Sequence, residues 1–278
     1  MAAWSRQTPW RQGHVLTKES SVALGLVSAE NVDSTSVVVI SHDCDLAQVV
    51  EAEPLVEVIV SQRIEKLDGN CTHAKNPRRL HLPCTASGTP IGLDLRAQAK
   101  ATILKEGLAD HAPNADVVMN PKDKAVLQRW LAARYRRSAF PDEFEECLKR
   151  TGVGQRLVKI LAPLGKYLIA VFFDVDEGVE KQRSGPDDRY VLQIYLLYST
   201  EEDPTLAAEV AEKAAGSIIA AFRDSCLDAT NGWKWIELSG CQPVADEAMT
   251  YSQSTQLKQW NMDYLSLRGD TPAEPMLD

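Results

Sequence analysis

The sequence predicts an α+β protein with an N-terminal small β-barrel-like unit, a helical connector and a C-terminal antiparallel or mixed sheet covered by a helix. Three observations support this. Short apolar runs, some alternating at a period of two, dominate residues 13–108, as in a small barrel or strongly twisted sheet. Amphipathic helical patterns follow over 120–150. Strand, helix and strand patterns then alternate, as in a sheet with one covered face.

Three strands are expected early in the chain, from runs of β-branched residues: GHVLTK (13–18), STSVVVIS (34–41) and EPLVEVIVSQRI (53–64). Gly and Pro punctuate residues 70–95, which predicts a long loop or irregular short strands. Asn120 can cap a helix whose first residue is Pro121. That helix is expected over 120–140, and Pro141 then begins a second, acidic-first helix.

The glycines near residues 150–156 are typical of a connector and predict a domain boundary there. After it we expect strands at 166–175, 189–199 and 233–240, a helix at 204–226 and a short helix at 256–267. Trp233, Trp235, Trp260 and Tyr264 are expected in the core of this part. The predicted organisation is a β-rich domain at 1–118, a helical connector at 119–152, an α+β domain at 153–268 and a mobile tail at 269–278.

Composition narrows the functional classes. The 278 residues carry a formal net charge of -9, which argues against a protein that coats nucleic acid non-specifically but allows a local basic patch. No apolar run approaches the roughly 18 residues of a membrane span, and the N-terminus lacks the apolar core of a secretory signal. The six cysteines have no framework spacing. We therefore expect a cytoplasmic protein with reduced thiols and no membrane partner.

The run VVVISHDCDLAQ (37–48) is unusual, because an apolar strand leads directly into Ser41, His42, Asp43, Cys44 and Asp45. If the strand continued, the side chains of His42 and Cys44 would share one face and the other three would share the opposite face. A histidine and a cysteine on one face could bind a metal or form a thiol–imidazole pair. Two aspartates could bind a divalent cation. His42, Asp43, Cys44 and Asp45 are therefore candidate catalytic residues, with Ser41 a binding residue. Alternatively, these groups only satisfy nearby backbone and Cys44 is a small buried hydrophobe.

A zinc site is a further possibility. His42 and Cys44, together with Cys71 and His73, would supply four ligands of suitable type, and Cys84 follows eleven residues after His73. The spacing differs from the paired cysteines of structural zinc sites, which are usually separated by two to four residues. A bound cofactor, if there is one, is therefore expected to be zinc or another divalent cation.

Two charged segments are also candidates. Arg129, Arg134, Arg136 and Arg137 lie beside aromatic residues, a combination that suits phosphate and base contacts. The alternative is a solvated helix face that pairs with the acidic residues after Pro141. Asp174 and Asp176 could form a metal-dependent nuclease site with Glu237, although carboxylates at a strand end are usually only solvated.

Residues 12–62 resemble the small barrel of the MazF/PemK-like toxin family, in the order QGHVLT, VVVIS, VEVIVSQRI. That family carries an Arg-Pro before its central strand, used in RNA cleavage, and here the positions are Ser34, Thr35 and Ser36. The ribonuclease activity is therefore not carried over. The pattern Ser41, Cys44, Asp45 and Leu46 also resembles a strand end in uncharacterised bacterial proteins linked to mobile elements. This second resemblance implies a bacterial origin without a known chemistry.

Three functional hypotheses remain open. The first is a binding or regulatory component of a mobile-element or phage-defence system that contacts nucleic acid or a protein partner encoded in the same operon. The second is a nuclease-type effector enzyme that uses the Ser41–Asp45 cluster. The third is a structural zinc-binding protein without activity of its own.

Overall fold

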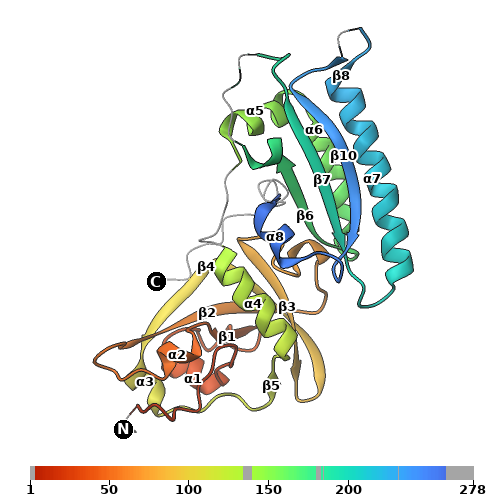
Figure 1. Ribbon diagram of the computed structural model, residues 1–278. Coiled ribbons are helices and arrows are strands. Elements are labelled where there is room, and N and C mark those ends of the chain that lie inside the picture. Colours follow the sequence, from red (N-terminus) through yellow and green to blue (C-terminus); the bar gives the residue numbers. More distant parts are fainter. Residues whose placement is uncertain (1–3, 134–139, 180–182, 184, 231, 261–278) are drawn as a thin grey trace. The chain divides into compact units, whose positions relative to one another are not determined.

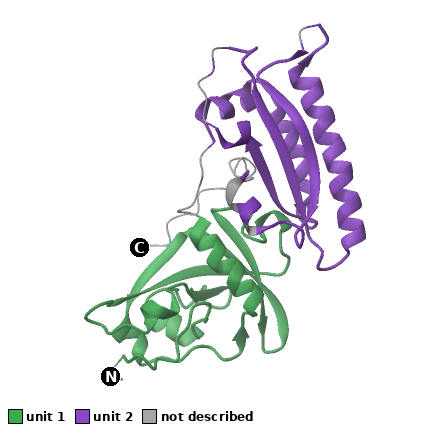
Figure 2. Ribbon diagram, in the orientation of Figure 1, with its two compact units in different colours: residues 1–135 green, residues 136–278 purple. Residues whose placement is uncertain are grey.

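The computed structural model describes residues 4–133, 140–179, 183, 185–230 and 232–260, and the chain divides into two compact units, 1–135 and 136–278 (Figure 2). Helices and strands are present in both units, so the predicted α+β class is confirmed. The N-terminal unit is built on a curled sheet and the C-terminal unit on a sheet with a helix (Figure 1).

The N-terminal sheet is a half-barrel of five antiparallel strands in the order β1-β2-β4-β3-β5. Its strands are β1 (Thr35–Val39), β2 (Leu55–Ile64), β3 (Arg79–Ala86), β4 (Thr89–Leu104) and β5 (Val117–Val118). Its helices are α1 (Lys18–Ala23), α2 (Asp43–Leu46), α3 (Lys105–Ala109) and α4 (Pro121–Ala133). The predicted strands at 34–41 and 53–64 are thus confirmed within the limits of β1 and β2.

Residues 79–95 form regular strands, so the predicted loop or irregular strands are wrong there. Strands β3 and β4 form a hairpin in which Ala86 pairs with Thr89. Ser87 and Gly88, which join them, have φ angles of 48° and 79°. Two successive positive φ angles are typical of the tight turn whose twist matches that of paired strands. The Ser-Gly pair was the local signal for this hairpin.

The predicted strand at 13–18 is reduced to two isolated bridges, Val15 with Val38 and Leu16 with Pro113. Helix α1 begins at Lys18, and the Thr17 side chain accepts a hydrogen bond from the Ser20 N–H. The segment before it still follows β1, because the Gly13 N–H donates to the Val39 carbonyl at 2.8 Å. Residues 11–14 are therefore fixed beside the end of β1.

Each face of the N-terminal sheet has its own core. Val37 and Val39 pack on one face and Val38 on the other, as a period of two requires. Helix α4 begins as predicted, with Asn120 Oδ1 accepting from the Asp123 N–H at 2.9 Å. It adds Val126, Leu127 and Trp130 to the Val38 side. Helix α4 therefore belongs to the N-terminal unit and is not part of a separate connector.

The C-terminal sheet has the order β10-β7-β6-β11 and is mixed, since β10 is parallel to β7 and the other pairs are antiparallel. Its strands are β6 (Leu168–Val175), β7 (Tyr190–Tyr198), β10 (Ile236–Ala245) and β11 (Lys258–Gln259). The long helix α7 (Pro204–Cys226) crosses from β7 to β10 and packs beside α6 (Val153–Leu161). A short pair, β8 (Leu227–Asp228) and β9 (Gly232–Trp233), follows α7. The predicted helix-covered sheet is therefore confirmed.

The predicted boundary near residues 150–156 is a turn inside the C-terminal unit. Helix α5 (Asp142–Arg150) ends there, Gly152 has a φ of 71°, and α6 begins at once. Left-handed backbone of this kind favours glycine. Phe144 and Leu148 of α5 lie in the same core cluster as Leu157 of α6. The predicted connector 119–152 is thus shared between the two units.

The aromatic residues late in the chain pack as predicted where the structure describes them. Trp260 is buried and stacks on Phe173, with ring centroids 5.5 Å apart. Trp233 and Trp235 pack against the same core. The predicted helix at 256–267 is wrong at β11, because α8 (Tyr251–Gln256) ends before it. Tyr264 and the tail 269–278 lie outside the described residues.

Over the described ranges, no helix is long and apolar enough to cross a membrane.

Candidate functional site

The run Ser41–Asp45 is a strand-to-helix turn and not a continuing strand. Strand β1 ends at Val39 and α2 begins at Asp43, so the predicted alternation of side chains from Ser41 to Asp45 does not occur. Ser41 is buried, and its hydroxyl accepts a hydrogen bond from the Glu57 N–H at 2.7 Å. The His42 ring accepts from the Cys44 N–H at Nδ1, at 3.3 Å, and caps the helix. Cys44 is exposed, so the alternative in which it is a small buried hydrophobe is wrong, although Ser41, His42 and Asp43 do accept hydrogen bonds from nearby backbone.

A buried lysine holds the other end of this turn. Lys105 has no exposed surface, and its ammonium donates to the carbonyls of Asp45 at 2.6 Å and Gln48 at 3.0 Å. The ring of Trp4 lies 5.7 Å from the same nitrogen. Burial lowers the pKa of Lys105, and the charges of Glu53 and Asp45 oppose this shift. These contacts fix the backbone that positions Asp43.

Asp43 is the centre of a polar cluster, which we call the Asp43 site: Arg11, His14, Asp43 and Lys124. Asp43 Oδ1 accepts from the Gln12 N–H at 2.7 Å, and Oδ2 accepts from Lys124 Nζ at 3.2 Å. Burial raises the pKa of Asp43, but these hydrogen bonds and the charges of Lys124 and Arg11 outweigh it, so the pKa is lowered overall. The Asp43 carboxylate is thus ionised and is held by a backbone N–H and by neighbouring basic side chains.

Gln12 ties the three segments of the Asp43 site together. Its buried side-chain amide donates to the Ile40 carbonyl at 2.7 Å and accepts from Gln128 Nε2 at 2.9 Å. Gln128 lies one turn after Lys124 on α4, so both side chains leave the helix on the same side. The residues before β1, the turn after it and α4 are therefore held in a fixed arrangement.

His14 presents a hydrogen-bond donor at this site. Its Nδ1 accepts from the Arg11 N–H at 3.2 Å, which places the proton of the neutral ring on Nε2. Burial lowers the pKa of His14, the charges of Lys124 and Arg11 lower it further, and Asp43 opposes them. The ring is therefore neutral at pH 7. His42 also accepts a backbone N–H at Nδ1, so neither ring has a free lone pair for general-base chemistry while these bonds hold.

The predicted zinc site is not formed. All four proposed ligands, His42, Cys44, Cys71 and His73, are described. Within the described part of the chain, however, no three His, Cys, Asp or Glu residues are grouped so as to hold a metal ion. Cys71 is buried next to β3, and burial raises the pKa of its thiol to about 11. Cys84 is buried in the core beside Leu82, where its pKa is raised to about 12.

The predicted arginine surface is only partly described. Arg129 is exposed on α4, while Arg134, Arg136 and Arg137 lie outside the described residues. Arg129 is five residues after Lys124, which corresponds to about 140° around a helix of 3.6 residues per turn. Arg129 therefore extends from a different side of α4 and is not a member of the Asp43 site.

A second polar cluster, missed in the sequence, lies on β3 and β4. Asp94 is buried, and Arg79 binds it through two hydrogen bonds of 2.8 and 2.9 Å. Arg96 Nε lies 3.5 Å from the same carboxylate, and His81 Nε2 lies 3.4 Å from it. Burial raises the pKa of Asp94, but hydrogen bonds from His81 and Arg79 and the charge of Arg79 lower it well below its usual range.

The Asp94 cluster, which consists of Arg79, His81, Asp94 and Arg96, stabilises the loop that precedes β3. His81 Nδ1 accepts from the Asp68 N–H at 2.9 Å, and its other ring nitrogen, Nε2, lies 3.4 Å from the Asp94 carboxylate. In the same loop His73 and Ala74 have φ angles of 55° and 61°, a costly conformation outside glycine. Because its acidic and basic groups interact with one another, we interpret the cluster as structural.

Lys75 in this loop gives the first testable prediction. Burial lowers its pKa to about 8, although its ammonium donates to the Gly69 carbonyl at 2.5 Å. Between pH 8 and 10.5 the unfolded chain holds this proton more tightly, so the free energy of unfolding should rise with pH, by about 3 kcal/mol over the whole window. In Lys75→Met this contribution should be absent, and the variant should be as stable as the wild type or more stable at pH 7.

Urea unfolding of both proteins at pH 7 and pH 10 measures this difference. Lys66→Met, at an exposed position, is the matched control and should keep the wild-type pH dependence. Parallel pH profiles for the wild type and Lys75→Met would contradict a buried, charged lysine at this position.

Most of the acidic cluster predicted in the C-terminal unit forms ion pairs with arginines. Asp176 forms an ion pair with Arg183 and also accepts from the Val191 N–H at 3.0 Å. Glu237 forms an ion pair with Arg189. Two of the three proposed carboxylates thus have cationic partners, and no metal-binding group of three is found in the described ranges. The predicted nuclease site is not formed.

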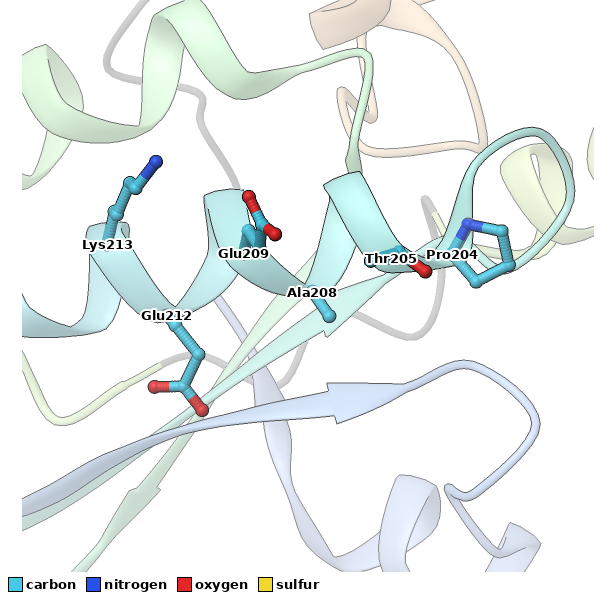
Figure 3. Close-up of a pocket in the computed structure, with 6 residues that line it drawn as sticks. All are labelled: Pro204, Thr205, Ala208, Glu209, Glu212 and Lys213. Carbon is cyan, nitrogen blue, oxygen red and sulfur yellow. The ribbon is translucent and has the colours of Figure 1, made fainter.

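An open hollow lies along the first turns of α7 (Figure 3). It is lined by Pro204, Thr205, Ala208, Glu209, Glu212 and Lys213. Figure 3 shows the Glu209 and Glu212 side chains pointing in different directions. A binding pocket usually places a few polar groups so that they converge on its ligand, which is not the case here.

Comparison with known proteins adds no assignment: no protein-family model, curated protein or solved structure matches this chain. The sequence pattern indicates Asp43 but not Arg11, His14 or Lys124. Asp43 and Lys124 are 81 residues apart, so no local pattern connects them.

Proposed function

We propose that the N-terminal unit binds nucleic acid through its phosphates, at the Asp43 site. The observation that carries the proposal is the way the Asp43 carboxylate is bound, by the Gln12 N–H and the Lys124 ammonium with Arg11 close by. Backbone N–H groups, lysines and arginines are also the groups that contact phosphate oxygens in nucleic-acid complexes. Arg11 is exposed and Lys124 is partly exposed, so a phosphate can reach them.

The protonation of His14 favours binding over cleavage. With Nδ1 occupied by the Arg11 N–H, the neutral ring can donate from Nε2 to a phosphate oxygen but cannot readily accept a proton from a nucleophile. The same holds for His42. The binding hypothesis is therefore preferred to a nuclease centred on Ser41–Asp45.

Lys124→Ala tests the proposal in the full chain. We expect affinity for a fluorescein-labelled single-stranded oligonucleotide to fall about fivefold to tenfold, and the salt dependence of binding to decrease by about one counterion. Asp43→Asn should bind more tightly, since it removes the competing negative charge. Fluorescence anisotropy at two salt concentrations measures both effects, and far-ultraviolet circular dichroism checks the fold.

Lys18→Ala is the matched control. Lys18 is an exposed lysine of the same unit that pairs with Asp33 at 2.5 Å, so its loss changes the net charge equally. Equal losses in the Lys124 and Lys18 variants would show that only overall charge matters. Strand scission of the oligonucleotide in the presence of EDTA would favour the nuclease hypothesis instead.

A further inference from the structure

One face of the N-terminal sheet loses its cover at the end where β2 begins and β4 ends. Leu55 and Leu104 pair directly across these strands and are 40% and 57% exposed. Along β2, Leu55 and Glu57 point to the same face as Ile59, which is fully buried in the core that α4 covers. The pair between them, Glu57 and Thr102, is polar and exposed, so Leu55 and Leu104 form a separate apolar patch at the end of the sheet.

Acidic residues surround this pair. Glu57 follows Leu55 on the same face, Glu106 follows Leu104 in α3, and Glu51 and Glu53 lie in the turn before β2. That turn is held beside Leu104, because the Lys105 N–H donates to the Pro54 carbonyl at 2.9 Å. None of the four glutamates forms an ion pair with a described residue.

The neighbouring lysine, Lys105, forms no ion pair with these glutamates. The Lys105 ammonium is directed inward to the carbonyls of Asp45 and Gln48 and has no exposed surface. The result is a pair of exposed leucines with a rim of glutamates that form no ion pair with a described residue. Such a surface is complementary to apolar side chains accompanied by lysine or arginine.

We propose that Leu55 and Leu104, with the rim of Glu51, Glu53, Glu57 and Glu106, form a docking surface for a basic amphipathic segment of a partner protein. The apolar pair contributes contact area and the glutamates select positive charge and exclude acidic partners. This surface shares no residue with the Asp43 site, and the proposal does not depend on nucleic-acid binding.

The probe is a synthetic helical peptide of leucines and lysines, and its counterpart has glutamate at each lysine position. With the full chain labelled at leucine methyl groups, the lysine peptide should shift the Leu55 and Leu104 signals, and the glutamate peptide should not. We expect the double variant Leu55→Ser/Leu104→Ser to weaken binding of the lysine peptide at least about tenfold. Glu51→Gln/Glu106→Gln should weaken binding and reduce its salt dependence.

Leu206→Ser is the matched control, because Leu206 is also 40% exposed and follows the acidic run Glu201–Asp203 at the start of α7. It should bind the peptide like the wild type. Equal shifts at Leu206, or unchanged affinity in the double variant, would overturn the proposal and leave only non-specific attraction to an acidic protein. A concentration-dependent dimer that Leu104→Ser abolishes would also overturn it, by identifying a second copy as the occupant.

Discussion

Asp94→Ala is expected to lower the free energy of unfolding of the N-terminal unit by about 3–5 kcal/mol, the usual cost of breaking a buried ion pair from one side. Asp94 is 3% exposed and binds Arg79 in a bidentate manner. Without it, Arg79 and Arg96, which are directly opposite across β3 and β4, would repel each other. His81 Nε2, which lies 3.4 Å from the carboxylate, would also lose its acidic neighbour.

The ion pair between Asp94 and Arg79 also predicts how stability depends on pH. The folded pKa of Asp94 is lowered, so its contribution is present above the unfolded pKa of about 3.9 and is lost as the pH falls through the lower folded value. Urea unfolding at pH 7 and pH 3, followed by circular dichroism, should show a smaller acid-induced loss in Asp94→Ala than in the wild type.

Asp116→Ala is a suitable control, since Asp116 is exposed on the segment before β5. It should change stability by less than about 0.5 kcal/mol, as surface substitutions usually do. If Asp94→Ala changed the free energy of unfolding as little as Asp116→Ala, the Asp94 cluster would not stabilise the fold as its geometry indicates.

Trp130→Ala should cost about 3–5 kcal/mol, the range for removing a large aromatic side chain from a core. Trp130 is 1% exposed, and its indole N–H donates to the Asn76 carbonyl at 2.9 Å. One side chain therefore attaches α4 both to the sheet and to the loop before β3. Thermal unfolding of the full chain measures the loss.

Trp130→Phe tests the hydrogen bond more selectively, because it keeps a six-membered aromatic ring in the core and removes the five-membered ring of the indole with its N–H. We expect it to cost about 1–3 kcal/mol, the penalty for an unsatisfied buried carbonyl. A helix that merely linked two domains would tolerate alanine at this position. A loss below 1 kcal/mol in Trp130→Ala would therefore contradict the assignment of α4 to the N-terminal core.

The elements that could be predicted have strong local signals. Strand β1 contains a run of valines, and α4 begins at an Asn-Pro cap. Helix α7 is a long alanine-rich segment that begins after Asp203 and ends at Cys226. The turn at Asp43 has no comparable signal. Its helix is four residues long and is capped by a histidine, which is not a usual cap residue.

The buried lysines and the Asp94 cluster could not be predicted for a different reason. The ammonium of Lys105 donates hydrogen bonds to carbonyls about sixty residues away, and such groups leave no pattern in the sequence. Asp94 meets His81 only because the turn at Ser87 and Gly88 sets the register of the hairpin. Reading that Ser-Gly pair as a hairpin would have placed Asp94 opposite His81 and revealed the cluster.

The mixed pairing in the C-terminal sheet has a consequence for the order in which this unit folds. Strand β10 pairs with β7 from Ile236 and Tyr190 onward, so the intervening chain, including all of α7, must fold back before the first contact forms. Closing a loop of this length costs conformational entropy that only later contacts repay, which slows folding. Strand β10 should therefore join the sheet late, after β6 and β7 have paired.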